Sequence, residues 1–362
     1  MKNRVQKLRE IYRSKGFDAY LVYGKEYIRY FTGIRFREDN EAFLCVTDSD
    51  MTVITDTRYK SVAEELRAKT GLFEVELASG LKKPEKIVEV FLGKAKKVGF
   101  DGYFLSHDLI DILRNRGLVC DSSHRDYVED ISIEKSIEEQ EKSKEALAIT
   151  ELVFEQDVLP ALKEGISEIE LSGIISLAHK RRGAEGDSFD PIVLFGENTV
   201  LPHGLPGARR LKEGDIVQID IGCAFEGICS DFSRVVSFGQ PDHEAQHLHK
   251  SLVKAQRLAV EYLQEGRDSF TFHNTAVTSL KADGYDFNLH GIGHGAGIVI
   301  HCQPHISLHA EKTVQIPDGA IFTVEPGVYI EGWLGMRVEN MLLMTSSGPI
   351  VLNKFPDDLI IL

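Results

Sequence analysis

The stretch that decides the fold runs from Ile216 to Arg234 and reads Ile216-Val-Gln-Ile-Asp220-Ile-Gly-Cys-Ala-Phe-Glu-Gly-Ile-Cys-Ser-Asp231-Phe-Ser-Arg234. Before the turn, apolar residues alternate with Gln218, Asp220 and Gly222, which is the period of a strand with one buried face. A connection as short as 222–227 joins only antiparallel neighbours. The stretch therefore predicts an antiparallel hairpin with apolar residues on one face and acidic groups on the other.

Two aspartates of this hairpin are expected on the same face. If the turn lies at Phe225-Glu226, Asp220 and Asp231 become direct cross-strand partners. Side chains in that position have Cβ atoms about 5 Å apart, where two like charges destabilise a sheet. A cation between them, or a proton on one of them, removes this cost. The alternative is a pair of ordinary surface aspartates near a turn, where this residue type is common.

A second acidic pair favours the functional alternative. Glu325 follows the apolar run Phe322-Thr-Val, and Glu339 lies in the run Gly335-Met-Arg-Val-Glu-Asn340. A carboxylate within an apolar run is uncommon, because its burial is costly unless it is paired or metal-bound. Between these segments lies His290-Gly-Ile-Gly-His-Gly-Ala-Gly-Ile-Val-Ile-His301, whose glycines permit close backbone approach.

These residues together suggest a metal site. Two divalent cations would cancel the charge of about −4 carried by four carboxylates, and water shared between them would lose a proton near neutral pH. An oxygen-rich set of this kind suits manganese, cobalt or iron better than a thiolate zinc site. The residues alone therefore predict a dinuclear metal centre.

The composition narrows the class of protein. The chain has 362 residues, a formal charge of −14 and 43% hydrophobic residues, which are globular values. The acidic balance argues against nucleic-acid binding, which needs clustered Lys and Arg. Its 5 cysteines form no CxxC pair and fit a reducing compartment. No apolar run suggests a membrane span, and the charged start does not look like a leader peptide. A cytoplasmic protein is expected.

The pattern of elements suggests two domains, with a boundary near 130–140. Residues 1–132 read as an α/β unit, with helices expected at 2–15 and 58–69 and strands at 18–23, 41–47 and 51–55. Residues 133–362 read as α+β. Their expected helices are 134–163, 167–182, 242–265 and 269–283, and their expected strands are 216–221, 228–238, 320–324 and 335–344.

The C-terminal half resembles the pita-bread metallopeptidases, a group that contains Xaa-Pro aminopeptidases, prolidases and methionine aminopeptidases. The matching segments are Ser188-Phe-Asp-Pro-Ile-Val, Asn198-Thr-Val-Leu-Pro-His203-Gly, the hairpin above, Gly293-His294-Gly-Ala-Gly, Glu325-Pro-Gly-Val-Tyr329 and Arg337-Val-Glu339. Residues 1–132 resemble the creatinase-type N-terminal domain in Gly16-Phe-Asp-Ala-Tyr-Leu-Val and Thr55-Asp-Thr-Arg-Tyr59. The resemblance spans nearly the whole chain and implies this N-terminal domain followed by a pita-bread catalytic domain.

The resemblance also implies residue roles. Asp220 would bind one metal ion, Asp231 and Glu339 would bridge both, and His294 and Glu325 would complete the other. The catalytic residues implied are His203, His290, His301, Glu325 and Arg337. The implied cofactor is a pair of divalent ions, with manganese expected and cobalt, iron(II) or zinc as alternatives.

The implied activity is hydrolysis of Xaa-Pro bonds, with a peptide carrying proline at its second position as the substrate. Glu325 would carry the proton, and His301 with His203 would stabilise the carbonyl oxygen and the tetrahedral intermediate. An Xaa-Pro aminopeptidase is the main expectation, because methionine aminopeptidases lack the N-terminal domain and carry glutamine at the Arg337 position. The alternatives are an Xaa-Pro dipeptidase (prolidase) and a catalytically inactive binding module of the same fold. Family habit also implies a homodimer.

Two positions depart from the family pattern. The chain has His301-Cys302 where the family usually has His-Glu, and Asn340 where it usually has Asp. Neither is an expected metal ligand, but Asn340 follows Glu339 directly and bears on how that carboxylate is supported.

One motif suggests a rival site. His243-Glu-Ala-Gln-His247 is an HExxH string, which on a helix places two zinc ligands and a general base on one face. Asp242 is typical of an N-cap, so the string is expected in an exposed first helical turn. No third histidine follows at the usual spacing. A solvated helix start is therefore expected.

Overall fold

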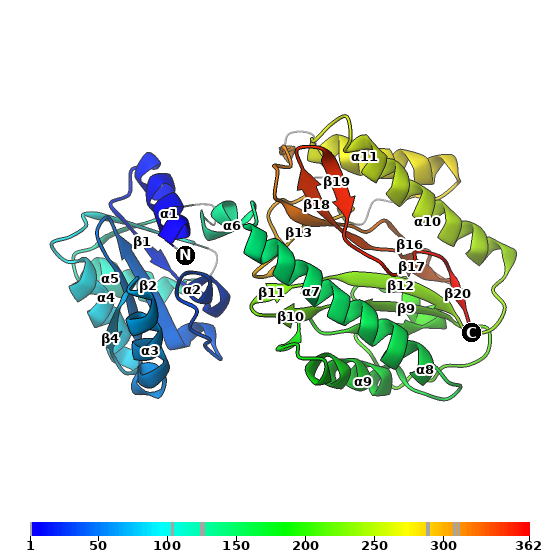
Figure 1. Ribbon diagram of the computed structural model, residues 1–362, viewed down its shortest axis with the longest axis horizontal. Helices are drawn as coiled ribbons and strands as arrows, with labels where there is room; N and C mark the ends of the chain where they lie inside the picture. Colours follow the sequence, from blue (N-terminus) through cyan, green and yellow to red (C-terminus); the bar gives the residue numbers. More distant parts are fainter. Residues whose placement is uncertain (1, 103–104, 124–126, 287–289, 307–308, 310–311) are drawn as a thin grey trace. The chain divides into compact units, whose positions relative to one another are not determined.

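The computed structural model describes residues 2–102, 105–123, 127–286, 290–306, 309 and 312–362. The chain divides into two compact units, residues 1–132 and residues 133–362 (Figure 1). Each unit has its own sheets and its own buried apolar clusters, so each is considered separately.

The first unit is built on a mixed sheet of six strands in the order β4-β3-β2-β1-β5-β6. Its strands are β1 Ala19–Val22, β2 Ala42–Thr47, β3 Met51–Thr55, β4 Glu74–Leu77, β5 Lys97–Phe100 and β6 Val119–Ser122. Its helices are α1 Lys2–Ser14, α2 Lys25–Thr32, α3 Lys60–Thr70, α4 Lys83–Phe91, α5 His107–Asn115 and α6 Tyr127–Ser132, with short 3-10 turns at Asp39–Glu41, Thr57–Tyr59 and Gly80–Lys82. The expected elements of this unit are confirmed to within about two residues.

The second unit contains the hairpin and the remaining segments of interest. Its helices are α7 Ile137–Val153, α8 Leu159–Ala161, α9 Glu168–Arg181, α10 His243–Tyr262 and α11 Ser269–Ala282, with a π-helical segment at Phe154–Val158 and a 3-10 turn at Gly196–Val200. Its strands are β7 Gly186–Asp187, β8 Ile192–Phe195, β9 Ile216–Ile221, β10 Cys223–Phe225, β11 Ile228–Cys229, β12 Phe232–Ser237, β13 Gly295–Ala296, β14 Ile300–Cys302, β15 Ile321–Val324, β16 Gly327–Tyr329, β17 Gly335–Arg337, β18 Asn340–Thr345, β19 Gly348–Val351 and β20 Ile360–Ile361.

Two larger sheets of the second unit each have their own helical cover. The sheet β20-β12-β9-β8 shares a core with α7 and α9, in which Leu171 and Ile175 join Val217 and Phe232. The sheet β14-β13-β15-β18-β19 shares another core with α10 and α11. In Figure 1, α10 and α11 lie on one side of the strands and α8 and α9 on the other. The strands between these helices carry the polar residues singled out above.

The hairpin is antiparallel as predicted, but its register differs from the predicted one. The turn lies at Glu226-Gly227, where both residues have positive φ (46° and 80°), as a two-residue hairpin turn requires. Glycine adopts this conformation without steric cost, which Phe225 could not. As a result Asp220 faces Ser233, and the prediction that it directly faces Asp231 is wrong.

Two expected strands are also interrupted. The run expected at 228–238 divides into β11 and β12 around Ser230-Asp231, and the run expected at 335–344 divides into β17 and β18 around Val338-Glu339. Each interruption falls on a residue predicted to bridge two metal ions. Irregularities of this kind re-aim a side chain that a regular strand would leave on the pleat.

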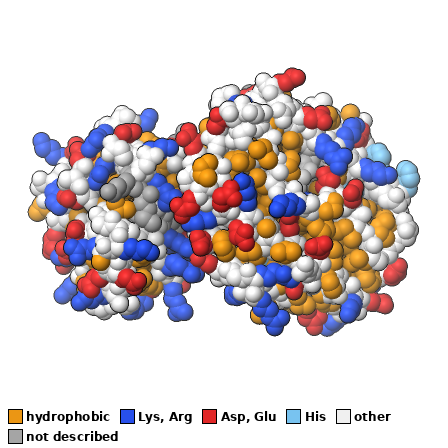
Figure 2. Space-filling model, in the orientation of Figure 1, with side chains coloured by type: hydrophobic (Ala, Val, Ile, Leu, Met, Phe, Trp, Pro, Cys, Tyr) orange, Lys and Arg blue, Asp and Glu red, His pale blue; other side chains and the backbone are white. Residues whose placement is uncertain are grey.

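On the face shown in Figure 2, acidic and basic side chains are intermixed with scattered apolar ones. Within the described part of the chain, no helix has both the length and the apolar composition that a membrane crossing requires.

Candidate metal centre

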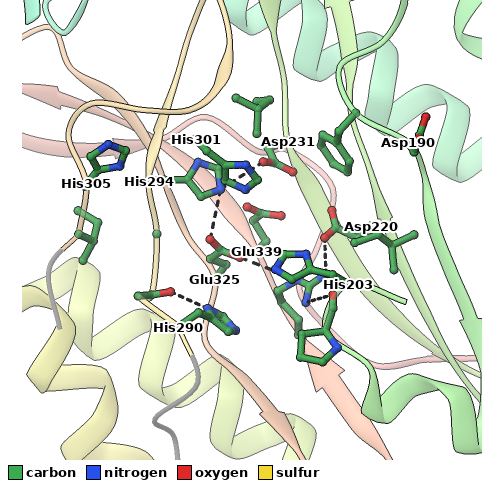
Figure 3. A pocket seen from close by; sticks show the side chains of 18 of the residues that line it. Asp190, His203, Asp220, Asp231, His290, His294, His301, His305, Glu325 and Glu339 are labelled. Atoms are coloured by element: carbon green, nitrogen blue, oxygen red, sulfur yellow. Dashed lines mark hydrogen bonds and ion pairs between the residues drawn. The ribbon is translucent and has the colours of Figure 1, made fainter. Parts of the chain in front are cut away.

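A cavity of ≈ 450 Å³ lies in the second unit. It falls within the ordinary size range of small-molecule sites. All the predicted site residues line it, namely His203, Asp220, Asp231, His290, His294, His301, Glu325, Arg337 and Glu339. Figure 3 labels the acids and histidines of this set and shows their side chains turned toward one another from separate strands and loops. The tertiary structure thus brings together residues that span more than a third of the sequence.

The hairpin places the two aspartates in the cavity lining. Asp220 lies on β9. Asp231 directly precedes β12, the strand that pairs with β9. Gly222 allows the two strands of the hairpin to approach closely here, since a Cβ at this position would lie 2.0 Å from the carbonyl oxygen of Ser230. Asp220 is 6% exposed and Asp231 is 4% exposed. Both carboxylates are therefore removed from bulk water and turned to the same side.

The second sheet and the segments next to it carry the two glutamates, Glu325 and Glu339, and the imidazole of His294. Glu325 follows β15, and Glu339 lies between β17 and β18. His294 precedes β13, and its backbone N–H donates to the hydroxyl of Thr323 at 3.1 Å. A Cβ on Gly293 would lie 2.1 Å from the carbonyl oxygen of Thr323. Glycine at 293 is thus what lets the histidine segment pass close to β15.

Burial of several acids in one place changes their ionisation. Burial first, and then the charge of Asp220, raises the pKa of Asp231 well above its usual value. Burial first, and then Asp231, does the same to the pKa of Glu339. Burial raises the pKa of Glu325 to about 8, against the opposing effect of Arg337. Protons would have to neutralise part of this group if no cation were bound.

His294 faces these acids in its neutral form. Burial lowers the pKa of His294 to about 3, with His301 as the next cause. Its Nδ1 lies 3.2 Å from the carbonyl oxygen of Gly295, which fits an Nδ1–H donor. The lone pair on Nε2 then points at Glu325 Oε1, 3.3 Å away, and at Asp231 Oδ2, 3.6 Å away. A lone pair and two carboxylate oxygens repel one another unless a cation or a proton lies between them.

The donor set fits divalent metal ions. Asp231, His294 and Glu339 each offer a ligand atom, and these atoms lie within 4.8 Å of one another. Asp220 Oδ1 and Glu339 Oε1 are buried and have no hydrogen-bond partner among the residues that the structure describes. Buried carboxylate oxygens without donors are costly, and a metal ion removes that cost. Four carboxylates and one neutral imidazole are ligands for metals that prefer oxygen.

The histidines predicted to contact substrate lie around these acids. The rings of His294 and His301 have centroids 4.2 Å apart, and His301 has a φ of 60°, a strained value for a residue other than glycine. Burial lowers the pKa of His290 to about 4. His203 and His301 are exposed to the cavity side. An imidazole at this rim can form a hydrogen bond with a bound substrate.

Comparison with known proteins identifies the family. The model "Metallopeptidase family M24" matches residues 141–346, which is more than half of the chain, and "Creatinase/Prolidase N-terminal domain" matches residues 4–126. The chain belongs to metallopeptidase family M24. This M24 protein is therefore a hydrolase, and the predicted creatinase-type domain followed by a pita-bread domain is confirmed. Metallopeptidases of this family use a dinuclear divalent metal centre.

Individual relatives cover the whole chain. The Xaa-Pro dipeptidase of Pyrococcus furiosus is 28% identical over 363 residues, covering 99% of this chain and 100% of the relative. The structure of an Xaa-Pro dipeptidase from Bacillus anthracis has a TM-score of 0.90 at 27% identity and covers 100% of this chain and 99% of that one. The structure of an X-Pro aminopeptidase from Thermotoga maritima has a TM-score of 0.87 at 27% identity, with 99% of both chains covered.

Arg337 of this M24 peptidase is fully engaged inside the protein. It is 3% exposed and is the one Arg or Lys among the described residues that line the cavity. Its guanidinium forms an ion pair with Asp220 and a hydrogen bond with the hydroxyl of Tyr329, and its Nε donates to Ser233 Oγ at 3.2 Å. The geometry favours a role in orienting Asp220 over direct contact with substrate.

Several residues at this site are not apparent from the sequence. Tyr329 and Ser233 both contact Arg337, and Ser233 Oγ also donates to Glu339 Oε2 at 3.0 Å. Both lie within the quoted motifs, but nothing in the linear pattern says which side chain meets the arginine. Phe189 and His305 also line the cavity. Trp333 packs against an apolar core.

The HExxH string lies outside the cavity. His243 begins α10, and the side chain of Asp242 caps the helix by accepting from the backbone N–H of Ala245 at 2.7 Å. His247 Nδ1 lies 2.9 Å from the hydroxyl of Tyr285. Neither histidine lines the cavity described above. The expectation of a solvated helix start is confirmed.

This placement predicts a ranking of histidine variants. His301→Ala should lower kcat/KM for an Xaa-Pro substrate by roughly 10²- to 10⁴-fold, because a donor to the developing negative charge is lost. His243→Ala and His247→Ala should stay within about twofold of the parent, as expected for surface substitutions. Steady-state kinetics with bound metal quantified in each variant checks this. The reverse ranking would favour the zinc motif of α10.

Proposed function

We propose that this protein hydrolyses Xaa-Pro dipeptides with two divalent metal ions, as a prolidase. The observation that carries the proposal is the convergence of four buried carboxylates and one neutral imidazole in a cavity of an M24 peptidase. The inactive binding-module alternative is disfavoured, since a module that binds no metal has no use for so costly a group of acids.

Five residues would hold the metal ions. Asp220 would bind one ion, His294 and Glu325 the other, and Asp231 and Glu339 would be shared between them. Metal ions at such a site act as Lewis acids and make water a nucleophile near neutral pH. Manganese is the proposed metal, with cobalt, iron(II) and zinc as alternatives. The identity of the metal, the cytoplasmic location and a homodimer stay predictions.

The remaining steps belong to residues of this chain. Glu325 would take the proton from the attacking water and pass it to the leaving proline nitrogen, since it lines the cavity and its Oε1 lies 3.3 Å from His294 Nε2. His203 and His301 would donate to the carbonyl oxygen of the scissile bond as negative charge develops there. Arg337 would hold Asp220 in place. Proline has no backbone N–H, so peptidases that hydrogen-bond that group cannot position this bond.

A dipeptidase is proposed ahead of an Xaa-Pro aminopeptidase. The Pyrococcus furiosus and Bacillus anthracis proteins named above are Xaa-Pro dipeptidases and match this chain from end to end. The Thermotoga maritima aminopeptidase matches it nearly as well, so the longer-peptide activity is the second candidate. The two activities differ in whether the site binds the free carboxylate that follows proline.

A comparison of two substrates tests the proposal. The Mn-loaded protein should cleave Gly-Pro with a kcat/KM about 10- to 100-fold above that for a longer Gly-Pro peptide, because one charge-assisted hydrogen bond to the terminal carboxylate contributes about 1.5–3 kcal/mol. Chromatography of released glycine measures both rates. N-acetyl-Gly-Pro, which lacks the free amine, is the control substrate and should not be cleaved. Equal or faster cleavage of the longer peptide would establish the aminopeptidase instead.

A further inference from the structure

Gln256 lies on α10, outside the cavity lining, and yet contacts the two segments that carry Glu325 and Glu339. It is 1% exposed. Its Nε2 donates to the carbonyl oxygen of Val324 at 3.1 Å and to that of Val338 at 3.0 Å. These two residues directly precede Glu325 and Glu339. One buried amide therefore holds together the backbone immediately before two proposed metal ligands.

Asn340 completes the contacts of this amide. Its Nδ2 donates to Gln256 Oε1 at 2.9 Å, and its Oδ1 accepts from Arg234 Nη2 at 2.9 Å. Arg234, 1% exposed on β12, also donates to the backbone carbonyl oxygens of Ser233, at 2.9 Å, and of Glu339. The network thus joins α10, β12, β15 and β18 behind the acidic cluster.

The direction of every hydrogen bond in this network is fixed by chemistry. A guanidinium only donates, so the atom of Asn340 that faces Arg234 must be its oxygen. The amide nitrogen of Asn340 is then left to face Gln256, which must offer its own oxygen. Gln256 in turn presents its nitrogen, and both of its hydrogens, to the two carbonyl oxygens. An amide is required at both positions.

We infer that Gln256 and Asn340 are a matched pair of positioning residues that sets the separation of Glu325 and Glu339 for metal binding. The inference rests on the proposed function for the role of those two carboxylates. An aspartate at position 340 would present a second oxygen to Gln256 Oε1, and two buried acceptors facing each other are unsatisfied.

Two isosteric variants test the pair. Gln256→Glu places a carboxylate oxygen against the carbonyl oxygens of Val324 and Val338. Asn340→Asp places a carboxylate oxygen against Gln256 Oε1, so that two acceptors face each other. Each should weaken Mn²⁺ binding to the metal-free protein by roughly 10- to 100-fold in isothermal titration calorimetry, the size of effect seen when the support of a metal ligand is lost. Gln246→Glu is the matched control: it is the same change on the same helix, where Gln246 Nε2 donates to the carbonyl oxygen of Pro241 and not to a segment that carries a proposed metal ligand. Its Mn²⁺ affinity should equal that of the parent.

A double-variant cycle separates positioning from general destabilisation. In the Gln256→Ala background the carboxylate introduced at position 340 no longer faces an acceptor, so Asn340→Asp should cost less than about threefold in Mn²⁺ affinity there. Gln256→Ala also serves if Gln256→Glu fails to fold. Lower urea midpoints with unchanged Mn²⁺ affinity, or an equal cost of Asn340→Asp in both backgrounds, would overturn the inference. Binding is read without substrate, so weakened Mn²⁺ binding in a protein that does not cleave Gly-Pro would support the pair while rejecting the proposed function.

Discussion

Glu339→Gln is expected to lower kcat/KM for Gly-Pro by at least ~10³-fold while the protein stays folded. Glu339 is 1% exposed and lies where the structure interrupts a strand to turn its carboxylate into the cavity. Its Oε2 accepts from Ser233 Oγ at 3.0 Å, and its Oε1 has no donor among the described residues. The glutamine amide keeps the shape of the glutamate side chain and its contact with Ser233. It removes the negative charge that two metal ions would share.

Three measurements on purified protein check this. Elemental analysis should find less bound metal in Glu339→Gln than in the parent, circular dichroism should be unchanged, and Gly-Pro cleavage should be lost. The control is Glu331→Gln, the same change at an exposed glutamate in the turn between β16 and β17. It should retain the activity and metal content of the parent. Full activity in Glu339→Gln would contradict the proposed sharing of this carboxylate.

Removal of metal is expected to abolish Gly-Pro cleavage entirely. Among the described residues that line the cavity, Arg337 is the one Arg or Lys that offsets the charge of these buried acids, and bound protons would have to neutralise the rest. A chelator should therefore stop the reaction, and Mn²⁺ or Co²⁺ added afterwards should restore it. Protein dialysed against a metal-free buffer without chelator, then treated identically, controls for handling. Activity that survives chelation, in protein shown by elemental analysis to be free of metal, would refute the metallopeptidase mechanism.

The stability of the metal-free protein should depend on pH in a defined direction. The pKa of Glu325 is raised by burial to about 8 in the folded chain, above its value of 4.5 without that environment. A group whose pKa rises on folding contributes its stability below the unfolded pKa and loses it as the pH passes the folded one. The melting temperature of metal-free protein should therefore fall between about pH 4.5 and 8, by roughly 5 °C or more.

Bound metal should remove this trend. The ligands must lose their protons to bind a cation, so metal affinity rises over the same range and offsets the loss. Differential scanning calorimetry at several pH values, with and without Mn²⁺, measures the two curves. Metal-free protein that becomes more stable between pH 4.5 and 8 would contradict the buried acidic cluster.

The sequence singled out residues that the structure brings to one cavity. Apolar alternation placed the hairpin at 216–234, and the uncommon acids within apolar runs singled out Glu325 and Glu339. The prediction that Asp220 and Asp231 share a face holds even though the predicted register is wrong. Moving the turn by one residue shifts the cross-strand partner by two positions, and two positions is one full period of a strand. Local pattern therefore fixes the face of a strand, and the turn residues fix its exact partner.

Only the tertiary structure decided how these residues act on one another. The strands are interrupted at Asp231 and Glu339, which no local pattern indicates. Two contacts join segments that are distant in the sequence: the ion pair of Arg337 with Asp220, and the hydrogen bond from Gln256 to the residue before Glu325. The hydrophobic periodicity of a strand or helix shows which of its faces is buried. These contacts depend instead on how two sheets and a helix pack together. A buried donor or acceptor must find its partner there, and that partner is set by packing across the core.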